Sequence, residues 1–382
     1  MNYSLSINGE YKNTLDIEGF SQMMKDPSYS YKFFWLEALV HLITEGKTET
    51  TFDEVIDEMI SNAWYTVLEF HIHLTYMMLG EPRDSIERAV LELKKCSDLP
   101  ANASKIEIKN AIREHEDELK IHKNNLTKNV PYRALAGFFK EGENSNIWGS
   151  YSRMIAYIER FDKTEAILPY TIGNQSGLKR ELHVSTKWAE MIKDNAVSIL
   201  GWIQYEKVRW LQNCNPEVPG LVYKLAPLDD KLRKLKNVHN MWDAIMEYHP
   251  VRDIFMDEII ADNKYDVDHF VPWSFVMNDE LWNLMPMDSS LNSKKSNKLP
   301  QWDPFFERFA GNQFMLYQEV HDKDRIHALY EKCIRDNLHS IWASEELYKP
   351  GNNKAVFFNI LEKNMRPVYD SARRQGYEMW IV

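Results

Sequence analysis

The first half of the chain carries apolar and polar residues at the spacing of helices. Residues 31–44 are apolar on every side, as in a helix buried within a core. The sequence TFDE from Thr51 to Glu54 has the form of a capping box, so we expect a helix to begin there and run towards Met78. Two further amphipathic stretches are expected to be helices, 84–95 and 104–122.

Polar, turn-rich segments separate these helices from a second helical block. We expect loops at 124–131 and 141–147 and a linker at 218–227, because Asn, Gly and Pro favour turns. The pattern predicts four more helical stretches, at 187–212, 229–248, 302–337 and 355–374. The fold class expected from this pattern is mainly α.

One segment departs from the helical pattern. Residues 267–271 are β-forming and should pair as a strand that ends at Pro272. Residues 282–285 form a second short apolar run, which closes at Pro286. A short helix is then expected to begin at a cap provided by Ser289 or Ser290 and to end before Pro300. The segment therefore predicts a small ββα arrangement inside a helical protein.

The chemistry of the chain is concentrated in this segment. Asp268 and His269 are adjacent and would face opposite sides of a regular strand, so they serve one site only if the strand twists or ends between them. In the short helix, Asn292, Lys295 and Ser296 share one face. Carboxylate and amide oxygens suit a hard cation such as Mg²⁺, and a neutral His can take a proton from water. One hard metal and one base are what phosphodiester hydrolysis requires, which points to a nuclease.

Composition limits how such a protein could hold its substrate. The 382 residues include 27% charged residues, with a net charge of −11. The overall field repels phosphate, so contact with nucleic acid has to come from a local basic patch. The candidate residues for such a patch are Lys231, Arg233, Lys234, Lys294 and Lys298. Surface solubility explains these residues equally well.

The three cysteines, Cys96, Cys214 and Cys333, lie far apart and form no C-x-x-C pair. This suits a reducing cytoplasm and speaks against a cysteine-based zinc knuckle at the motif, so no structural zinc is expected. The N-terminus has no secretion signal, and no apolar run is long enough to span a bilayer. A cytoplasmic protein without a membrane partner is expected.

The segment resembles the HNH motif of the ββα-metal endonucleases, in the variant whose last signature residue is Asn. Its opening, Asp266 to Phe275, and its close, Asn292 to Pro300, are most similar to the HNH domain of RNA-guided CRISPR effector nucleases. The resemblance covers about a tenth of the chain. It implies a small ββα-metal nuclease core near the C-terminus, with a large helical region before it and helices after it.

The resemblance also implies a role for each signature residue. His269 would be the general base that activates water, and Asp268 and Asn292 would hold one Mg²⁺ or Mn²⁺. Asn283 would support the loop that carries His269, and Lys295 would lie near the phosphate. The substrate implied is nucleic acid, with DNA favoured over RNA.

The rest of the chain leaves several roles open. We expect a helical recognition or regulatory region at 1–215, the nuclease core with its preceding helix at 216–305, and a helical region packed on the core at 306–382. A restriction-like or anti-phage defence nuclease fits these regions. A non-catalytic or regulated binding or scaffold subunit of a larger defence complex and an RNA-directed nuclease are the alternatives, and a protein partner or a homo-oligomer fits each of them.

Overall fold

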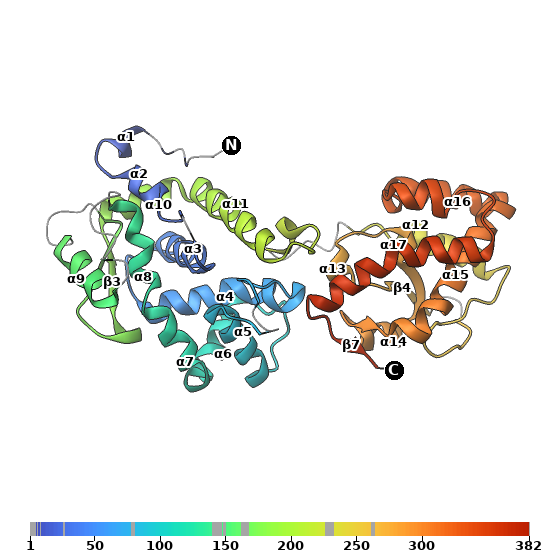
Figure 1. Ribbon diagram of the computed structural model, residues 1–382, viewed down its shortest axis with the longest axis horizontal. Coiled ribbons are helices and arrows are strands. Elements are labelled where there is room, and N and C mark those ends of the chain that lie inside the picture. The colour runs from blue at the N-terminus through green and yellow to red at the C-terminus, as the bar shows by residue number, and fades with distance from the viewer. Residues whose placement is uncertain are drawn as a thin grey trace. The chain divides into compact units, whose positions relative to one another are not determined.

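The computed structural model describes residues 5, 7, 9–25, 27–77, 81–139, 147, 150–161, 168–225, 233–260 and 264–381. The described chain is mainly α, as predicted, and divides into two compact units, Met1–Pro216 and Glu217–Val382 (Figure 1). Among its described helices, none is both long and apolar enough to cross a membrane.

The first unit is built around α3 (Tyr31–Thr44), which is buried on nearly every side, as its apolar pattern predicts. It packs against α4 (Phe52–Phe70), α10 (Thr186–Asp194) and α11 (Ala196–Cys214). The other helices of this unit are α1 (Gly9–Lys12), α2 (Ile17–Ser21), α5 (Ser85–Cys96), α6 (Lys105–Glu114), α7 (Glu116–Thr127), α8 (Val130–Arg133) and α9 (Tyr151–Phe161), with 3-10 turns at Ala134–Phe138 and Gly177–Lys179.

The start of α4 is as predicted, but its end is not. The Thr51 side chain accepts a hydrogen bond from the Glu54 backbone N–H at 3.2 Å. The Glu54 carboxylate also accepts hydrogen bonds from Lys47 and Thr50. The expected run towards Met78 is wrong, because His71 takes a left-handed φ of 51° and ends the helix at Phe70.

Two of the predicted helices are each divided by one residue. His115 separates α6 from α7, and Asn195 separates α10 from α11, both with a φ of −115°. A break of one residue leaves the apolar spacing nearly unchanged, so periodicity does not reveal it. The expected loop at 124–131 is also wrong, since α7 continues to Thr127 and α8 begins at Val130. Of the loop expected at 141–147, only Ile147 lies within the described residues.

A small antiparallel sheet of the first unit was not predicted. Its strands are β1 (Glu49–Thr51), β2 (Tyr170–Ile172) and β3 (Glu181–Val184), in the order β1-β3-β2. Thr50 lies opposite Leu182, and Tyr170 lies opposite Val184. Strands of three or four residues are too short to give a clear alternating pattern.

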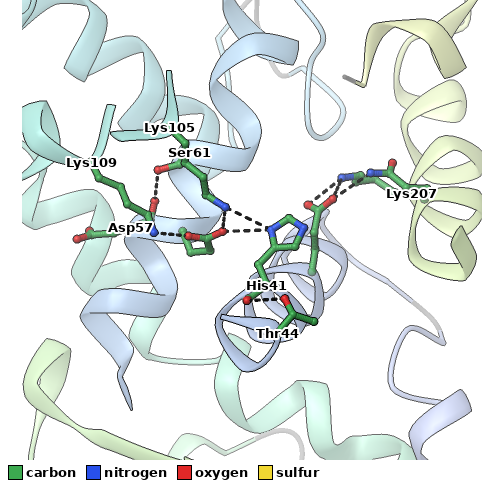
Figure 2. Close-up of polar contacts among 10 residues, drawn as sticks. His41, Thr44, Asp57, Ser61, Lys105, Lys109 and Lys207 are labelled. Carbon is green, nitrogen blue, oxygen red and sulfur yellow. Dashed lines mark hydrogen bonds and ion pairs between the residues drawn. The ribbon is translucent and has the colours of Figure 1, made fainter. Parts of the chain in front are cut away.

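Buried ion pairs connect the helices of this unit, as Figure 2 shows. The fully buried Glu58 of α4 accepts from Lys105 and, at 2.5 Å, from Lys109, both on α6. It also lies 3.1 Å from Nδ1 of His41 on α3. On the same helix α3, Glu37 pairs with Lys207 of α11 at 2.8 Å. Charged side chains thus connect α3 to α4 and α11, and α4 to α6.

The second unit contains the predicted strand, loop, strand and helix. The strand β4 (Tyr265–His269) pairs antiparallel with β5 (Leu284–Asp288), and α14 (Ser289–Lys295) packs against both. Between the strands lie α13 (Trp273–Val276) and a 3-10 turn at Leu281–Asn283. The surrounding elements are a 3-10 turn at Leu221–Lys224, α12 (Lys236–Met246), β6 (Leu299–Pro300), α15 (Trp302–Asp322), α16 (Asp324–Asn337), a π-helical turn at Ala343–Leu347, α17 (Lys354–Arg374) and β7 (Met379–Trp380).

Details of the ββα core differ from the prediction. Pro286 lies inside β5, opposite Val267, and does not end the strand. The N-cap of α14 is Asp288, whose carboxylate accepts from the backbone of Ser290 and Leu291, and neither predicted serine is the cap. Ser296 leaves the helix with a φ of 48° and does not continue its face.

Helix boundaries elsewhere in this unit are also corrected. The stretch 302–337 is two helices, which meet at Lys323, where the backbone is extended. Helix α12 begins only at Lys236, and of the residues predicted before it, 229–232 lie outside the described part. The expected linker includes Leu221 and Lys224, which are both buried, so this part of it belongs to the folded unit.

Candidate active site

The polar side chains of the strand β4 lie on its two opposite faces. Tyr265, Val267 and His269 are buried, whereas Asp266 and Asp268 are half-buried on the other face. Successive residues of a strand point in opposite directions, which produces this alternation. Asp268 and His269 therefore lie on opposite faces at the end of the strand.

Helix α14 supplies two side chains to the acidic face of β4. Lys295 places its Nζ 2.7 Å from Oδ2 of Asp268 and 2.8 Å from the backbone oxygen of His269. Asn292 donates from Nδ2 to Oδ2 of Asp266 at 3.1 Å. Lys295 is completely buried, so its charge is neutralised by Asp268 and not by solvent. These contacts gather Asp266, Asp268, Asn292 and Lys295 in one place.

Asn283 fixes the chain that follows His269. It is fully buried, its Oδ1 accepts from the Val271 N–H at 2.8 Å, and its Nδ2 donates to the Val271 oxygen at 2.9 Å. Its own backbone oxygen accepts from Phe270 at 2.9 Å. The amide side chain thus makes the pair of bonds that a neighbouring strand would make.

His269 is held by a residue that the sequence did not single out. The imidazole is 1% exposed, and its Nε2 lies 3.1 Å from Oδ1 of Asp279 and 3.2 Å from the backbone oxygen of Asn278. Its Nδ1 lies 3.5 Å from Nη2 of Arg233. The proximity of Asp279 depends on the path of the loop between the strands, for which the sequence gives no spacing rule.

Asp279 also joins His269 to Arg233. Its Oδ1 lies 3.4 Å from Nε of Arg233, whose guanidinium stacks over the ring of Trp273 at 5.4 Å. Burial raises the pKa of Asp279, but the hydrogen bond from His269 and the nearby charges outweigh burial and leave the pKa below its ordinary value. Asp279 is therefore a carboxylate at neutral pH, where it can accept the imidazole N–H.

The predicted basic residues do not all lie near these side chains. Arg233 lies at His269, whereas Lys234 is largely exposed and pairs with Asp336 at 2.9 Å. Lys294 is exposed, and Lys298 lies 3.9 Å from Glu378. Lys231 lies outside the described residues.

The donor set on the acidic face fits a hard divalent cation. Asp266, Asp268 and Asn292 offer oxygen atoms only, which is the ligand type that Mg²⁺ and Mn²⁺ prefer. Asp266 was not predicted as a site residue, although its spacing of two from Asp268 places both carboxylates on one strand face. These oxygen donors therefore suit a hard cation without sulfur or a second imidazole, but the Lys295 ammonium already pairs with Asp268 on this face.

Within the described residues, two groups of three His, Cys, Asp or Glu side chains are close enough together to hold a metal, and both belong to the first unit. One consists of Cys96, His115 and Glu118, which are half-buried or exposed. In the other, the carboxylates of Asp53, Asp57 and Glu116 surround a lysine ammonium, that of Lys123, at 2.6 to 2.7 Å. The lysine thus fills the space that a cation would take.

Comparison with known families agrees with this geometry. Residues 251–301 match the family model described as HNH endonuclease, a range that contains β4, β5 and α14. The second unit therefore carries a domain of the HNH endonuclease family. No curated protein and no solved structure matches the chain. The finer likeness to CRISPR effector nucleases stays a prediction.

Proposed function

We propose that this protein is a metal-dependent endonuclease that hydrolyses phosphodiester bonds in nucleic acid, with DNA as its preferred substrate. The observation that carries the proposal is that a histidine held by a carboxylate, His269, directly follows the two carboxylates of β4 in the chain. Its imidazole is fixed by Asp279, and the carboxylates of Asp266 and Asp268 lie on the other side of the same strand end. In the proposal, the base and the cation site act on the same phosphate from the end of this strand.

His269 acts as the general base in this proposal. When Nε2 carries the proton and donates it to Asp279 or to the Asn278 oxygen, Nδ1 carries the lone pair, which lies 3.5 Å from Nη2 of Arg233, so the attacking water has to replace that contact. Nδ1 then accepts the proton of the attacking water. General-base catalysis of this kind contributes about 10² to 10⁴ in rate.

Asp268 and Asn292 hold the metal, with Asp266 as an additional oxygen donor. A bound Mg²⁺ or Mn²⁺ would polarise the phosphoryl group and stabilise the leaving oxygen. Asp266 also accepts the Asn292 amide N–H, which orients the amide of that side chain. In this arrangement Asp266 supports the ligand position of Asn292.

Lys295 and Asn283 position the other groups. A contact between Lys295 and phosphate was expected, but its burial against Asp268 and the His269 carbonyl favours a positioning role for the ammonium. Arg233 is better placed for phosphate, because its guanidinium is one-third exposed and lies next to Nδ1 of His269. One guanidinium group can donate hydrogen bonds to two phosphate oxygens at once, so Arg233 can hold the scissile phosphate beside the base.

The biological setting that we propose is a restriction-like or anti-phage defence nuclease, as the motif resemblance suggests. The alternative is a binding or scaffold subunit whose HNH domain is inactive. The presence of His269, Asp268 and Asn292 together supports the catalytic assignment, because an inactive domain has no need of a base next to a metal site.

A nicking assay with plasmid DNA and Mg²⁺ tests the function directly. We expect cleavage by the wild-type protein, inhibition by EDTA, and a loss of at least about 10²-fold in rate for His269→Ala, since the base is removed. His327, which is exposed on α16, provides the matched control, and His327→Ala should cleave normally. Equal rates for wild type and His269→Ala would show that the activity does not come from this site. The same assay on single-stranded RNA decides the substrate preference.

A further inference from the structure

The first unit contains a half-open cavity of about 470 Å³ beside the start of α3. Its volume lies within the range of small-molecule sites in proteins. The segment before α3 and the helix α8 form its walls, so two stretches about a hundred residues apart in sequence meet there. Neither stretch belongs to the nuclease domain.

Two aromatic rings provide a flat surface in this cavity. Tyr29 and Tyr31 both line it, and their rings are stacked at 5.1 Å with an angle of 8° between their planes. The Tyr31 hydroxyl accepts from the Ser85 backbone N–H at 2.8 Å, and Arg83 lies 3.5 Å from the Tyr29 hydroxyl. These bonds fix the rings before any ligand arrives, and a fixed aromatic surface favours a planar, aromatic ligand.

Two basic side chains line the same cavity as the tyrosine rings. Lys32 and Arg133 line the cavity, and its described lining residues include no carboxylate, although the protein as a whole has a net charge of −11. The Lys32 ammonium is held by the Lys25 backbone oxygen at 2.8 Å. Ammonium and guanidinium groups bind phosphate oxygens. Asn129, also in the lining, carries both a donor and an acceptor that suit the edge of a base.

We propose that this cavity binds a nucleotide, with its base against the tyrosine pair and its phosphate between Lys32 and Arg133. A base joined to a phosphate occurs both in a free nucleotide and in a strand of nucleic acid. The proposal goes beyond the nuclease activity and does not depend on it, because binding there requires neither His269 nor a metal.

Calorimetric titration of the full chain in EDTA tests the proposal without cleavage. The probes are adenosine triphosphate, a short single-stranded oligodeoxyadenylate, and pyrophosphate, which lacks a base. We expect pyrophosphate to bind more weakly than the probes that carry a base. Stronger binding of adenosine triphosphate identifies a free nucleotide as the ligand, and stronger binding of the oligonucleotide identifies a strand.

Two variants locate the binding. Tyr29→Ala should weaken binding of the preferred probe about five- to a hundredfold, the range that base–aromatic stacking provides. Arg133→Gln should weaken it by at least about fivefold, because the phosphate loses a charged partner. The matched controls are Tyr205→Ala and Arg209→Gln, which change a ring and a guanidinium stacked at 5.7 Å on α11, away from the cavity lining. Because Arg133 is exposed, Arg133→Gln remains informative even if Tyr29→Ala unfolds the unit. The proposal is overturned if the wild type binds no probe, if pyrophosphate binds as tightly as the nucleotides, or if the control variants weaken binding equally.

Discussion

Asp279 is the residue that most changes the picture of the candidate site. The motif named the base, His269, but the carboxylate that fixes its ring comes from the loop between the strands. A carboxylate in this position holds the tautomer and stabilises the imidazolium that forms when the base takes a proton. An amide in the same place could do only part of this.

We therefore expect Asp279→Asn to lower kcat by about 10²-fold or more, because the base loses its negative partner. The Mg²⁺ dependence should change little, since Asp279 contacts neither Asp268 nor Asn292 in the described contacts, whereas KM should rise if Arg233, which pairs with Asp279, binds the phosphate. Steady-state kinetics over a range of pH and Mg²⁺ measure both effects. The matched variant Asp336→Asn, which disrupts the pairs with Lys234 and Arg335 and does not touch His269, should keep wild-type kcat. A wild-type kcat for Asp279→Asn would remove this residue from the mechanism.

A second prediction for a single residue concerns Lys224 and the dependence of stability on pH. Lys224 is completely buried and donates to the Phe275 backbone oxygen at 2.5 Å, and burial lowers its pKa from 10.5 to about 7. Between these two values the unfolded chain binds a proton that the folded chain does not, so stability rises with pH across this window.

Lys224→Met removes this dependence. The stability of the wild type relative to the variant should rise between pH 7 and 10, by at most about 1.4 kcal/mol per pH unit. Thermal unfolding of both proteins at several pH values measures the difference. A difference that stays constant over this range would mean that the folded lysine keeps an ordinary pKa.

Sequence predicted the signature residues because adjacency and helical spacing are local properties. His269 and Asp268 are adjacent, and Asn292 and Lys295 are one helical turn apart. The relative positions within each pair therefore do not depend on how the surrounding elements pack. Arg233 and Asp279 are different, since 46 residues separate them and only the folded loop brings them together. Contacts of this kind depend on tertiary structure, and composition or spacing cannot reveal them.

At the scale of elements, charge pairs explain part of how the helices of the first unit are held. Burial raises the pKa of Glu58, but hydrogen bonds from His41, Lys105 and Lys109 outweigh it and lower the pKa from 4.5 to about 2. Glu58 thus carries a charge that two lysines on α6 compensate, and it also contacts His41 on α3. Its contribution to stability is present above pH 4.5 and is lost as the pH falls towards 2.

Glu58→Gln should destabilise the protein by about 3 kcal/mol at pH 7, because removing one partner of a buried charge network leaves the others unpaired. The difference in unfolding free energy between the wild type and the variant should shrink as the pH falls from 4.5 towards 2, because the wild type then also loses the charge. Chemical denaturation at several pH values measures it. Glu54→Gln, in a half-exposed pair with Lys47, is the control and should cost no more than about 1 kcal/mol. Equal effects of the two variants would contradict the stabilising role of the network.

The apolar pattern predicted the helices well but not where they break. The residues 31–44 matched α3 completely, because an all-apolar run has little alternative to a core helix. The breaks at His115 and Asn195 have no Gly or Pro to mark them. Similarly, Pro286 was expected to end a strand, but its missing N–H costs nothing on the side of β5 where no strand pairs.

At the scale of the whole molecule, the nuclease domain and the nucleotide cavity lie in different units, 217–382 and 1–216. The proposed recognition or regulatory role of the first unit is consistent with this separation. Since all residues proposed for catalysis belong to the second unit, cleavage chemistry and recognition can be measured apart.

We expect a fragment of residues 217–382 to fold by itself, because it has its own core, which includes Phe270, Leu284 and Phe309. Metal-dependent nicking should persist in the fragment, while any binding of adenosine triphosphate or oligodeoxyadenylate by the cavity should be lost. Circular dichroism, thermal unfolding and the nicking assay measure these properties. His269→Ala in the fragment is the control and should abolish its cleavage. A folded fragment without activity would mean that the first unit contributes directly to catalysis, and an unfolded fragment would mean that the two units depend on each other for stability.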